Sequence, residues 1–213
     1  MKKTEIILKE GYPFVGVTGG LFLISLIFRF DAIWQIGYFV LFAFMLYFFL
    51  NPERVPDEEG EDVIISPADG EIIEIIETKE PFFSNKDMIK ISIRLSLLDN
   101  HVQRAPIDGY LRESKYVHGE FLALSSAKAS ELNEQNRTLF ENDKFFVVTN
   151  QIAGFITRRI VSWESEGKIP LAKRYGMIMF GSQVDIYVPK ETTLKVILWE
   201  KLKAGESVIG FLK

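Results

Sequence analysis

The strongest indication of fold in this chain is the segment Tyr175-Gly-Met-Ile-Met-Phe-Gly-Ser-Gln-Val-Asp-Ile-Tyr-Val-Pro189. Its first half is apolar, and residues 185–188 alternate as a strand does when one of its faces is buried. Gly181 and Ser182 lie between the two halves. Gly181 leaves its carbonyl sterically open and permits backbone torsions that other residues resist. The Ser182 hydroxyl is therefore a candidate to attack that carbonyl in an N-to-O acyl shift.

An acyl shift at this position has a defined chemical outcome. The shift gives an ester, β-elimination cuts the chain, and hydrolysis of the resulting dehydroalanine amine leaves a pyruvoyl ketone on the new N-terminus. That ketone would be an electron sink made from the protein itself. About one Gly-Ser pair is expected by chance in a chain of this length, however, and most such pairs lie in turns. The dipeptide alone leaves both interpretations open.

Alternating and β-branched runs occur on both sides of this segment and are bounded by Gly, Pro or Asp. They predict strands at residues 63–65, 71–77, 88–94, 144–149, 185–188 and 194–198. Residues 127–137 are rich in Ala, Glu and Leu, which predicts a short helix or a loop. The pattern indicates a mainly β domain over residues 63–213, with a sandwich-like or barrel-like architecture.

Two apolar runs, residues 12–28 and 32–50, precede this domain. Each is near the lower end of the ~17–25 residues that a helix needs to cross the hydrocarbon core of a bilayer. Aromatic residues lie near the ends of the second run, as they do at membrane interfaces. We expect residues 1–50 to form a transmembrane helical hairpin. A cleaved signal peptide and a buried soluble hairpin are the alternatives.

The charges that flank the two runs predict their orientation. Three lysines and an arginine lie outside the hairpin, whereas its connecting loop carries one arginine; these residues are Lys2, Lys3, Lys9, Arg54 and Arg29. The positive-inside rule then places both ends of the hairpin, and the β domain, on the cytoplasmic side of the cell membrane. Residues 51–62 are acidic and contain prolines, so we expect a solvated linker there.

The composition of the 213 residues excludes several kinds of site. The chain has no cysteine, which rules out disulfides, thiolate metal sites and a cysteine nucleophile. Its two histidines are too few for a His-rich metal site, and we expect no metal. The net charge is -4 and the basic residues are dispersed, which argues against a nucleic-acid partner.

Phe180-Gly-Ser-Gln-Val-Asp185 resembles the Phe-Gly-Ser-x-Val-Asp processing site of short-form phosphatidylserine decarboxylases. Further segments match this family in the same order, so that the resemblance covers about residues 12–190. They are Asn51-Pro-Glu-Arg54, Ser66-Pro-Ala-Asp-Gly70, Asn100-His-Val-Gln-Arg-Ala-Pro106, Asn133-Glu-Gln-Asn-Arg137, Gln151-Ile-Ala-Gly154 and Arg158-Arg-Ile160. The short form is also similar to archaetidylserine decarboxylases, so ester-linked and ether-linked lipids are both open as substrates.

The resemblance implies a membrane-anchored enzyme of phospholipid biosynthesis that converts phosphatidylserine to phosphatidylethanolamine and CO2. It implies self-cleavage between Gly181 and Ser182 into a β chain, residues 1–181, and an α chain, residues 182–213. The covalent pyruvoyl cofactor would come from Ser182 and form a Schiff base with the substrate amine. The two chains would stay together, and a dimer of such pairs is a further expectation.

Asp69 and His101 are the other catalytic candidates. From the residues alone, Asp69 is a turn residue and His101 is a solvated histidine at a loop edge. The resemblance implies instead that Asp69 polarises His101, which can take and give a proton near neutral pH. Longer members of the family have a second histidine where this chain has Arg104. His101 would therefore serve cleavage, decarboxylation or both.

Arginines are the candidates for binding the lipid phosphate, because a guanidinium group fits phosphate oxygens. They are Arg104, Arg158 and Arg159. His118 is assigned no catalytic role, because the proline that follows in the family is absent. Two other classes of function remain open. One is a serine hydrolase using Ser182, although Gly-x-Ser-x-Gly is missing; the other is a non-catalytic, membrane-tethered β module that binds a partner or a lipid headgroup.

Overall fold

The computed structural model describes residues 5–124, 128–155, 159–180 and 182–212. The chain divides into two compact units, Met1–Glu53 and Arg54–Lys213. Gly181 and Arg158 of the candidate site, and Lys2 and Lys3 of the hairpin, lie outside the described residues.

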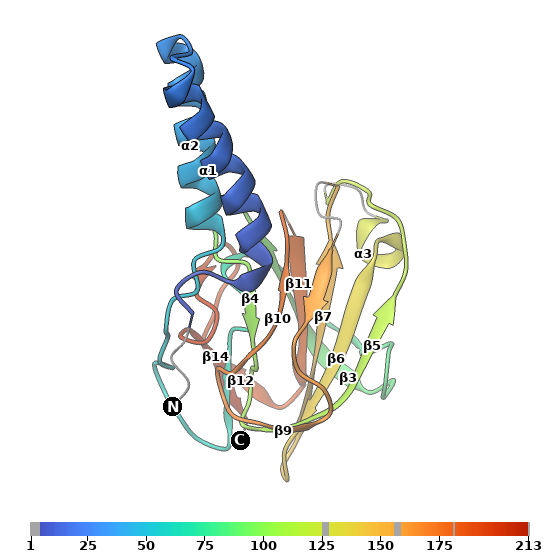
Figure 1. Ribbon diagram of the computed structural model, residues 1–213. Helices are drawn as coiled ribbons and strands as arrows, with labels where there is room; N and C mark the ends of the chain where they lie inside the picture. The colour runs from blue at the N-terminus through green and yellow to red at the C-terminus, as the bar shows by residue number, and fades with distance from the viewer. Residues whose placement is uncertain (1–4, 125–127, 156–158, 181, 213) are drawn as a thin grey trace. The chain divides into compact units, whose positions relative to one another are not determined.

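The first unit is an antiparallel helical hairpin (Figure 1). A 3-10 turn, η1 (Lys9–Gly11), leads into α1 (Tyr12–Ile27), and α2 (Ala32–Phe48) follows after a short connection. Aromatic rings join the two helices, with the Phe22 and Phe39 centroids 5.4 Å apart. The two predicted helices are confirmed, and each ends one or two residues before the apolar run does.

Most large apolar side chains of the hairpin are exposed. Lys9–Ile27 is long and apolar enough to cross a membrane, with 19 residues and a mean hydropathy of 1.4. Ala32–Phe48 is apolar but shorter, with 17 residues. These features are weak evidence for membrane association, and the spanning of a bilayer by both helices stays a prediction.

The described part of the second unit forms three antiparallel sheets. One has eight strands in the order β13-β2-β3-β11-β7-β6-β5-β9, and the others have the orders β4-β10-β8 and β1-β14-β12. The strands are β1 (Val63–Ile65), β2 (Gly70–Lys79), β3 (Asp87–Leu95), β4 (Val102–Arg104), β5 (Gly109–Val117), β6 (Gln135–Glu141), β7 (Phe146–Ala153), β8 (Ile160–Ser162), β9 (Gly167–Ile169), β10 (Arg174–Ile178), β11 (Ser182–Pro189), β12 (Thr192–Leu194), β13 (Lys201–Leu202) and β14 (Val208–Leu212).

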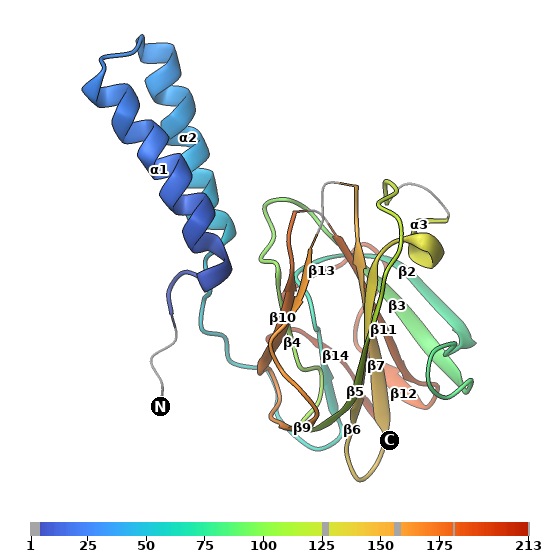
Figure 2. The same cartoon turned by 45° about the vertical axis from the view of Figure 1, so that its right-hand side comes forward.

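The sheets pack as a sandwich around one main apolar core. In Figure 2, β4 and β10 form a layer beside the layer that contains β11, β7 and β6. Side chains alternate along β11: Val184, Ile186 and Val188 belong to the main core. Tyr187 belongs to a smaller cluster on the opposite face, with Met88 and Val148. The predicted mainly β, sandwich-like fold is confirmed.

One local prediction is wrong and another is confirmed in part. The strand expected at residues 194–198 is wrong beyond Leu194, because β12 ends there and the chain turns back toward β2. Trp199 has φ of 70° in that turn and its amide donates to the Ile72 carbonyl at 2.9 Å. The short helix expected within residues 127–137 is present as α3 (Ala129–Leu132), but the end of that segment belongs to β6, which begins at Gln135.

Candidate active site

Ser182 is the first residue of β11, a central strand of the large sheet. It pairs with Leu95 of β3 on one side and with Ala153 of β7 on the other. Its side chain is fully buried, and its Oγ has no hydrogen-bond partner among the described residues. A buried hydroxyl without a partner costs about 1–3 kcal/mol, so such groups are uncommon unless they have a function. Alternation places Ser182 on the core face of the sheet, with Val184.

The backbone immediately before this serine is strained. Phe180 has φ of 62°, in the left-handed region that bulky L-residues avoid. A residue held in that region costs about 1–3 kcal/mol and is characteristic of functional sites. The strain lies next to the Gly181–Ser182 bond at which cleavage is expected, although Gly181 itself is outside the described residues.

His101 is joined to the strand that leads into the serine. The Ile178 amide donates to the His101 carbonyl at 3.2 Å, four residues before Ser182. The imidazole is fully buried, and its Nδ1 lies 2.7 Å from the Asp99 carbonyl oxygen. Because a carbonyl only accepts, Nδ1 carries the proton of the neutral ring and Nε2 is the basic nitrogen.

The protonation state of His101 follows from its burial. Burial lowers the pKa of His101 to about 4, although the hydrogen bond to Asp99 and the charges of Asp99 and Asp69 act to raise it. The ring is therefore neutral at pH 7, in the form that can accept a proton. This differs from the solvated loop-edge histidine that its sequence context suggests.

Asp69 is the centre of a buried hydrogen-bond cluster. Both of its carboxylate oxygens accept from the Arg54 guanidinium, with Nη2 at 2.8 Å from Oδ2. The Ala204 amide donates to Oδ1 at 2.7 Å, and the Asn100 amide donates to Oδ2 at 3.3 Å. The Nδ1 partner of His101 is the Asp99 carbonyl, so Asp69 acts on His101 through its charge and through the neighbouring Asn100 backbone.

Arg54 is the functional candidate that the sequence reasoning missed. The sequence marks it by its charge next to the hairpin and by its place in the matched segment Asn51–Arg54, and the structure adds its paired contact with Asp69 and its hydrogen bond to the Ala204 carbonyl at 3.0 Å. Both residues belong to segments that match the family, Asn51–Arg54 and Ser66–Gly70. The presence of both residues in matched segments was the signal that could have pointed to Arg54. The sequence does not show that they pair, because they are fifteen residues apart.

Other matched segments hold the strands around Ser182. The Asn133 side chain donates to the carbonyl of Ala153, the residue paired with Ser182, at 2.7 Å. Gln151 donates to Gln103 of β4 at 2.9 Å and thereby links the two layers. These contacts fix the backbone on which the candidate site is built.

The arginine candidates have different environments. Arg104 is 3% exposed, and its Nη1 donates to the Ala172 carbonyl at 3.1 Å. Arg159 is exposed, and its carbonyl accepts from the Met179 amide at 3.2 Å, three residues before Ser182. Arg158 lies outside the described residues. Of the two described candidates, only Arg159 has an exposed side chain. The His118 ring packs edge-on against Tyr116, with centroids 5.1 Å apart.

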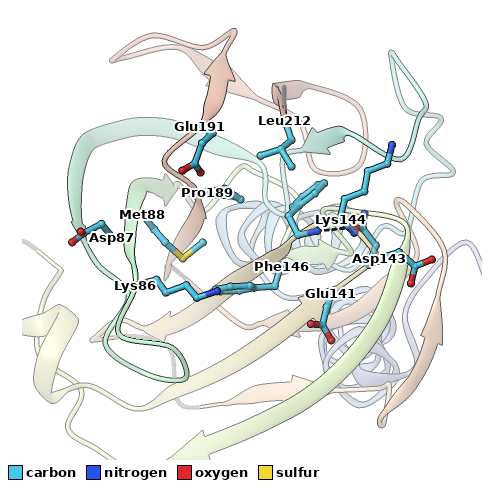
Figure 3. A pocket seen from close by; sticks show the side chains of 12 residues that line it. Lys86, Asp87, Met88, Glu141, Asp143, Lys144, Phe146, Pro189, Glu191 and Leu212 are labelled. Atoms are coloured by element: carbon cyan, nitrogen blue, oxygen red, sulfur yellow. Dashed lines mark hydrogen bonds between the residues drawn. The ribbon is translucent and has the colours of Figure 1, made fainter.

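A hollow of about 530 Å³ lies at the other end of β11 and is separate from this site (Figure 3). Pro189 lines it, together with Lys86, Phe146 and Leu212. Pro189 is seven residues beyond Ser182, which corresponds to about 23 Å along a strand. Within the part of the chain that the structure describes, no group of three acidic or histidine residues could hold a metal ion.

Comparison with known proteins gives a consistent result. The family model described as phosphatidylserine decarboxylase matches residues 41–210. A phosphatidylserine decarboxylase proenzyme of Syntrophus aciditrophicus is 40% identical over 214 residues, which cover 99% of each chain. Proenzymes of the same name from Ehrlichia canis and Desulfotalea psychrophila are 38% and 40% identical, over 96% and 95% of this chain and 91% and 94% of their own.

Proposed function

Since this chain belongs to the phosphatidylserine decarboxylase family, we propose that it is a self-cleaving precursor of an enzyme that decarboxylates the serine headgroup of a phospholipid. The observation that carries the proposal is the buried Ser182 hydroxyl at the start of β11, which has no hydrogen-bond partner among the described residues. It follows a strained Phe180 and lies on a strand tied to the neutral His101.

Each residue of the site has a part in the proposed cleavage. Ser182 Oγ attacks the Gly181 carbonyl carbon, Nε2 of His101 takes the hydroxyl proton, and that proton passes to the leaving amide nitrogen. The result is an ester with a free amine on residue 182. Removal of the Ser182 α-proton then expels Gly181 as a carboxylate. Water hydrolyses the remaining enamine, which releases ammonia and leaves the ketone.

The residues at Ser182 fit the formation of a pyruvoyl group. Within the described ranges no hydrogen bond competes for the buried hydroxyl, and the ketone would occupy the end of a strand held on both sides. Once formed, a pyruvoyl group supplies the electron sink for loss of CO2. His101, buried and neutral, is the candidate to return a proton to the substrate carbon.

The Asp69 cluster would serve both cleavage and decarboxylation by holding the backbone next to His101 in place. Its carboxylate holds Asn100, which precedes His101, and Ala204, which belongs to the proposed α chain. The Ser66 carbonyl also accepts from the Gly205 amide at 2.8 Å. Hydrogen bonds at Asp69 and Ser66 therefore join the proposed β chain to the proposed α chain.

The proposed α chain would stay in place after cleavage. Its strand β11 lies between β3 and β7, and β13 pairs with β2. Its remaining strands, β12 and β14, form a sheet with β1 of the proposed β chain. Separation of the two chains would require the loss of both sheets. A dimer of such two-chain units stays a prediction.

We also propose that the hairpin of α1 and α2 anchors the enzyme in the cell membrane, with the second unit in the cytoplasm. If the site opens at the membrane interface, a diacyl substrate need not leave the bilayer to react. Arg159 is the proposed contact for the lipid phosphate, and Arg104 and Arg158 are secondary candidates. Ester-linked and ether-linked serine lipids are both retained as substrates.

The deciding experiment compares the parent chain with Ser182→Ala. The parent should split into two bands on a denaturing gel and release CO2 from a serine phospholipid, whereas Ser182→Ala should remain one inactive chain. Ser162→Ala, at an exposed serine of β8, is the matched control and should cleave normally. Parallel assays with ester-linked and ether-linked serine lipids identify the substrate.

Two results would reject the proposal. If Ser182→Ala were cleaved and active, Ser182 would have neither role. If the parent stayed intact, a serine hydrolase or a binding module would be favoured, and activity toward a simple ester would separate those two.

A further inference from the structure

The face of the large sheet opposite to Ser182 carries buried polar side chains. Gln183 and Asp185 of β11 are 5% and 2% exposed, and Ser92 of β3 and Asn150 of β7 are each 1% exposed. The outer face of a sandwich is normally solvated. Four polar side chains buried together on that face therefore require an explanation.

Two connecting segments flank these residues and leave a cavity of about 780 Å³. Phe82, from the β2–β3 connection, packs edge-on against Tyr187 with ring centroids 5.7 Å apart. Leu124 and Ser130, from the segment that contains α3, lie on another side. This volume is in the range of sites that bind small organic molecules. The cavity begins at Gln183, the residue after Ser182, but on the other side of the sheet.

The floor of the cavity offers hydrogen-bond acceptors. Asn150 Oδ1 is buried without a partner among the described residues, while its Nδ2 donates to Gln135 at 3.0 Å. Asp185 Oδ1 accepts from the Gln183 side chain at 2.8 Å. Burial raises the pKa of Asp185, because its charge is only partly compensated there. The nearby ammonium of Lys90 is already paired with Glu74 at 2.5 Å.

Positive charge lies beside this floor, because Arg137 of β6 pairs with Asn150 of β7. The Arg137 guanidinium stacks on the Phe82 ring, 4.1 Å from its centroid. Its Nε and Nη2 donate to Gln135 Oε1 at 3.2 and 3.0 Å, which holds the group in one orientation. Arg94 also lines the cavity and is exposed. A carboxylate or phosphate can therefore be bound on this side.

We propose that this cavity binds a small zwitterion, with its ammonium group at Asn150 Oδ1 and Asp185 and its phosphate or carboxylate at Arg137. The ammonium would donate to the amide oxygen of Asn150 and would also compensate the charge of the buried carboxylate, which an anion without donor groups cannot do. The site is separate from the cleavage site, which is on the core face of β11. It does not depend on the proposed decarboxylation.

The test is calorimetric titration of the full-length Ser182→Ala chain with phosphoethanolamine and, separately, with serine. The substitution removes the hydroxyl from which a ketone would form, so the amine of the probe has no ketone with which to condense. Saturable binding is expected for one or both probes, and the stronger one identifies the anion as phosphate or carboxylate. Ethanolamine and inorganic phosphate, which each lack one charge, should bind at least tenfold more weakly.

Three further variants in this background locate the binding. Asp185→Asn should weaken it at least tenfold, and Leu124→Trp, which places bulk at the cavity wall, should abolish it. Asp87→Asn removes an acid of the hollow in Figure 3 and should have no effect. The proposal is overturned if neither zwitterion binds at millimolar concentration, or if binding survives both Asp185→Asn and Leu124→Trp.

Discussion

Replacement of Arg54 by glutamine should destabilise the second unit far more than a comparable change at the surface. Arg54 and Asp69 side chains are 10% and 11% exposed, and the guanidinium contacts both carboxylate oxygens. Removal of one partner of a buried ion pair costs about 3–5 kcal/mol, because the other charge is left uncompensated. Asp69 keeps its bonds from Ala204 and Asn100, so the lower end of that range is expected.

Arg112 provides the matched control. It forms an ion pair with Glu141 at 2.7 Å, but the two side chains are 51% and 43% exposed. Exposed pairs contribute about 0–1 kcal/mol, because solvent screens the charges. Arg112→Gln should therefore cost no more than about 1 kcal/mol.

The assay is urea unfolding of the full-length chain in mild detergent, in the uncut Ser182→Ala background, so that one covalent chain is compared throughout. The midpoint should fall for Arg54→Gln with an unchanged slope if only stability is affected. With Ser182 present, the same substitution should also slow cleavage, because Asp69 positions Asn100 next to His101. Arg54→Lys should rescue incompletely, since one ammonium cannot reproduce a two-pronged contact.

Equal losses of stability for Arg54→Gln and Arg112→Gln would refute this reasoning. A double variant gives an independent check. Arg54→Gln with Asp69→Asn removes both charges and should be less destabilised than the sum of the two single changes. Additive losses would mean that the two side chains do not interact energetically.

Three more outcomes are expected. Because burial lowers the pKa of His101 to about 4, the unfolded chain binds an additional proton at this residue between that value and about pH 6.5. The contribution of His101 to stability should therefore be constant above pH 6.5 and fall as pH drops toward 4. Urea unfolding at several pH values should show this slope in Ser182→Ala, and His101→Gln should flatten it. Gly70→Ala should reduce the soluble yield and stability of the uncut chain, because Gly70 has φ of 141° and a Cβ would overlap the Arg94 carbonyl; an unchanged midpoint would contradict this. Deletion of residues 1–50 should leave a second unit that is recovered without detergent, and fractionation that still finds it in the membrane would show that the hairpin is not the sole anchor.

Strands could be predicted where their own residue pattern defines them, but not where a distant partner decides the path of the chain. The residue pattern located β2, β3 and β11, because each of these strands places several apolar side chains on its core face. It failed at residues 195–198, which have the same composition but leave the sheet so that the chain can reach β13. The residues of that segment do not indicate that β13 pairs with β2.

The candidate site shows the same limit. The resemblance led to Ser182, Asp69 and His101. In the structure the Asn100 amide, next to His101, donates to Asp69. The Ile178 amide, four residues before Ser182, donates to the His101 carbonyl. The burial of His101 was not predictable, because its immediate neighbours are those of an exposed loop. The polar cavity on the outer face of β11 was also not predictable. The alternation of β11 predicts that Asp185 faces solvent, and the segments that flank the cavity are distant from Asp185 in sequence.

The central position of β11 has a consequence for the lifetime of the protein. Before cleavage, folding is unimolecular, and an unfolded chain can recover its strands at any dilution. After a cut before Ser182, recovery requires two polypeptides to meet, so it becomes second order and slows as the concentration falls. The released short chain would also expose the apolar face of β11, which favours aggregation over reassociation. The cleaved protein would therefore persist through a slow rate of unfolding and not through a reversible equilibrium.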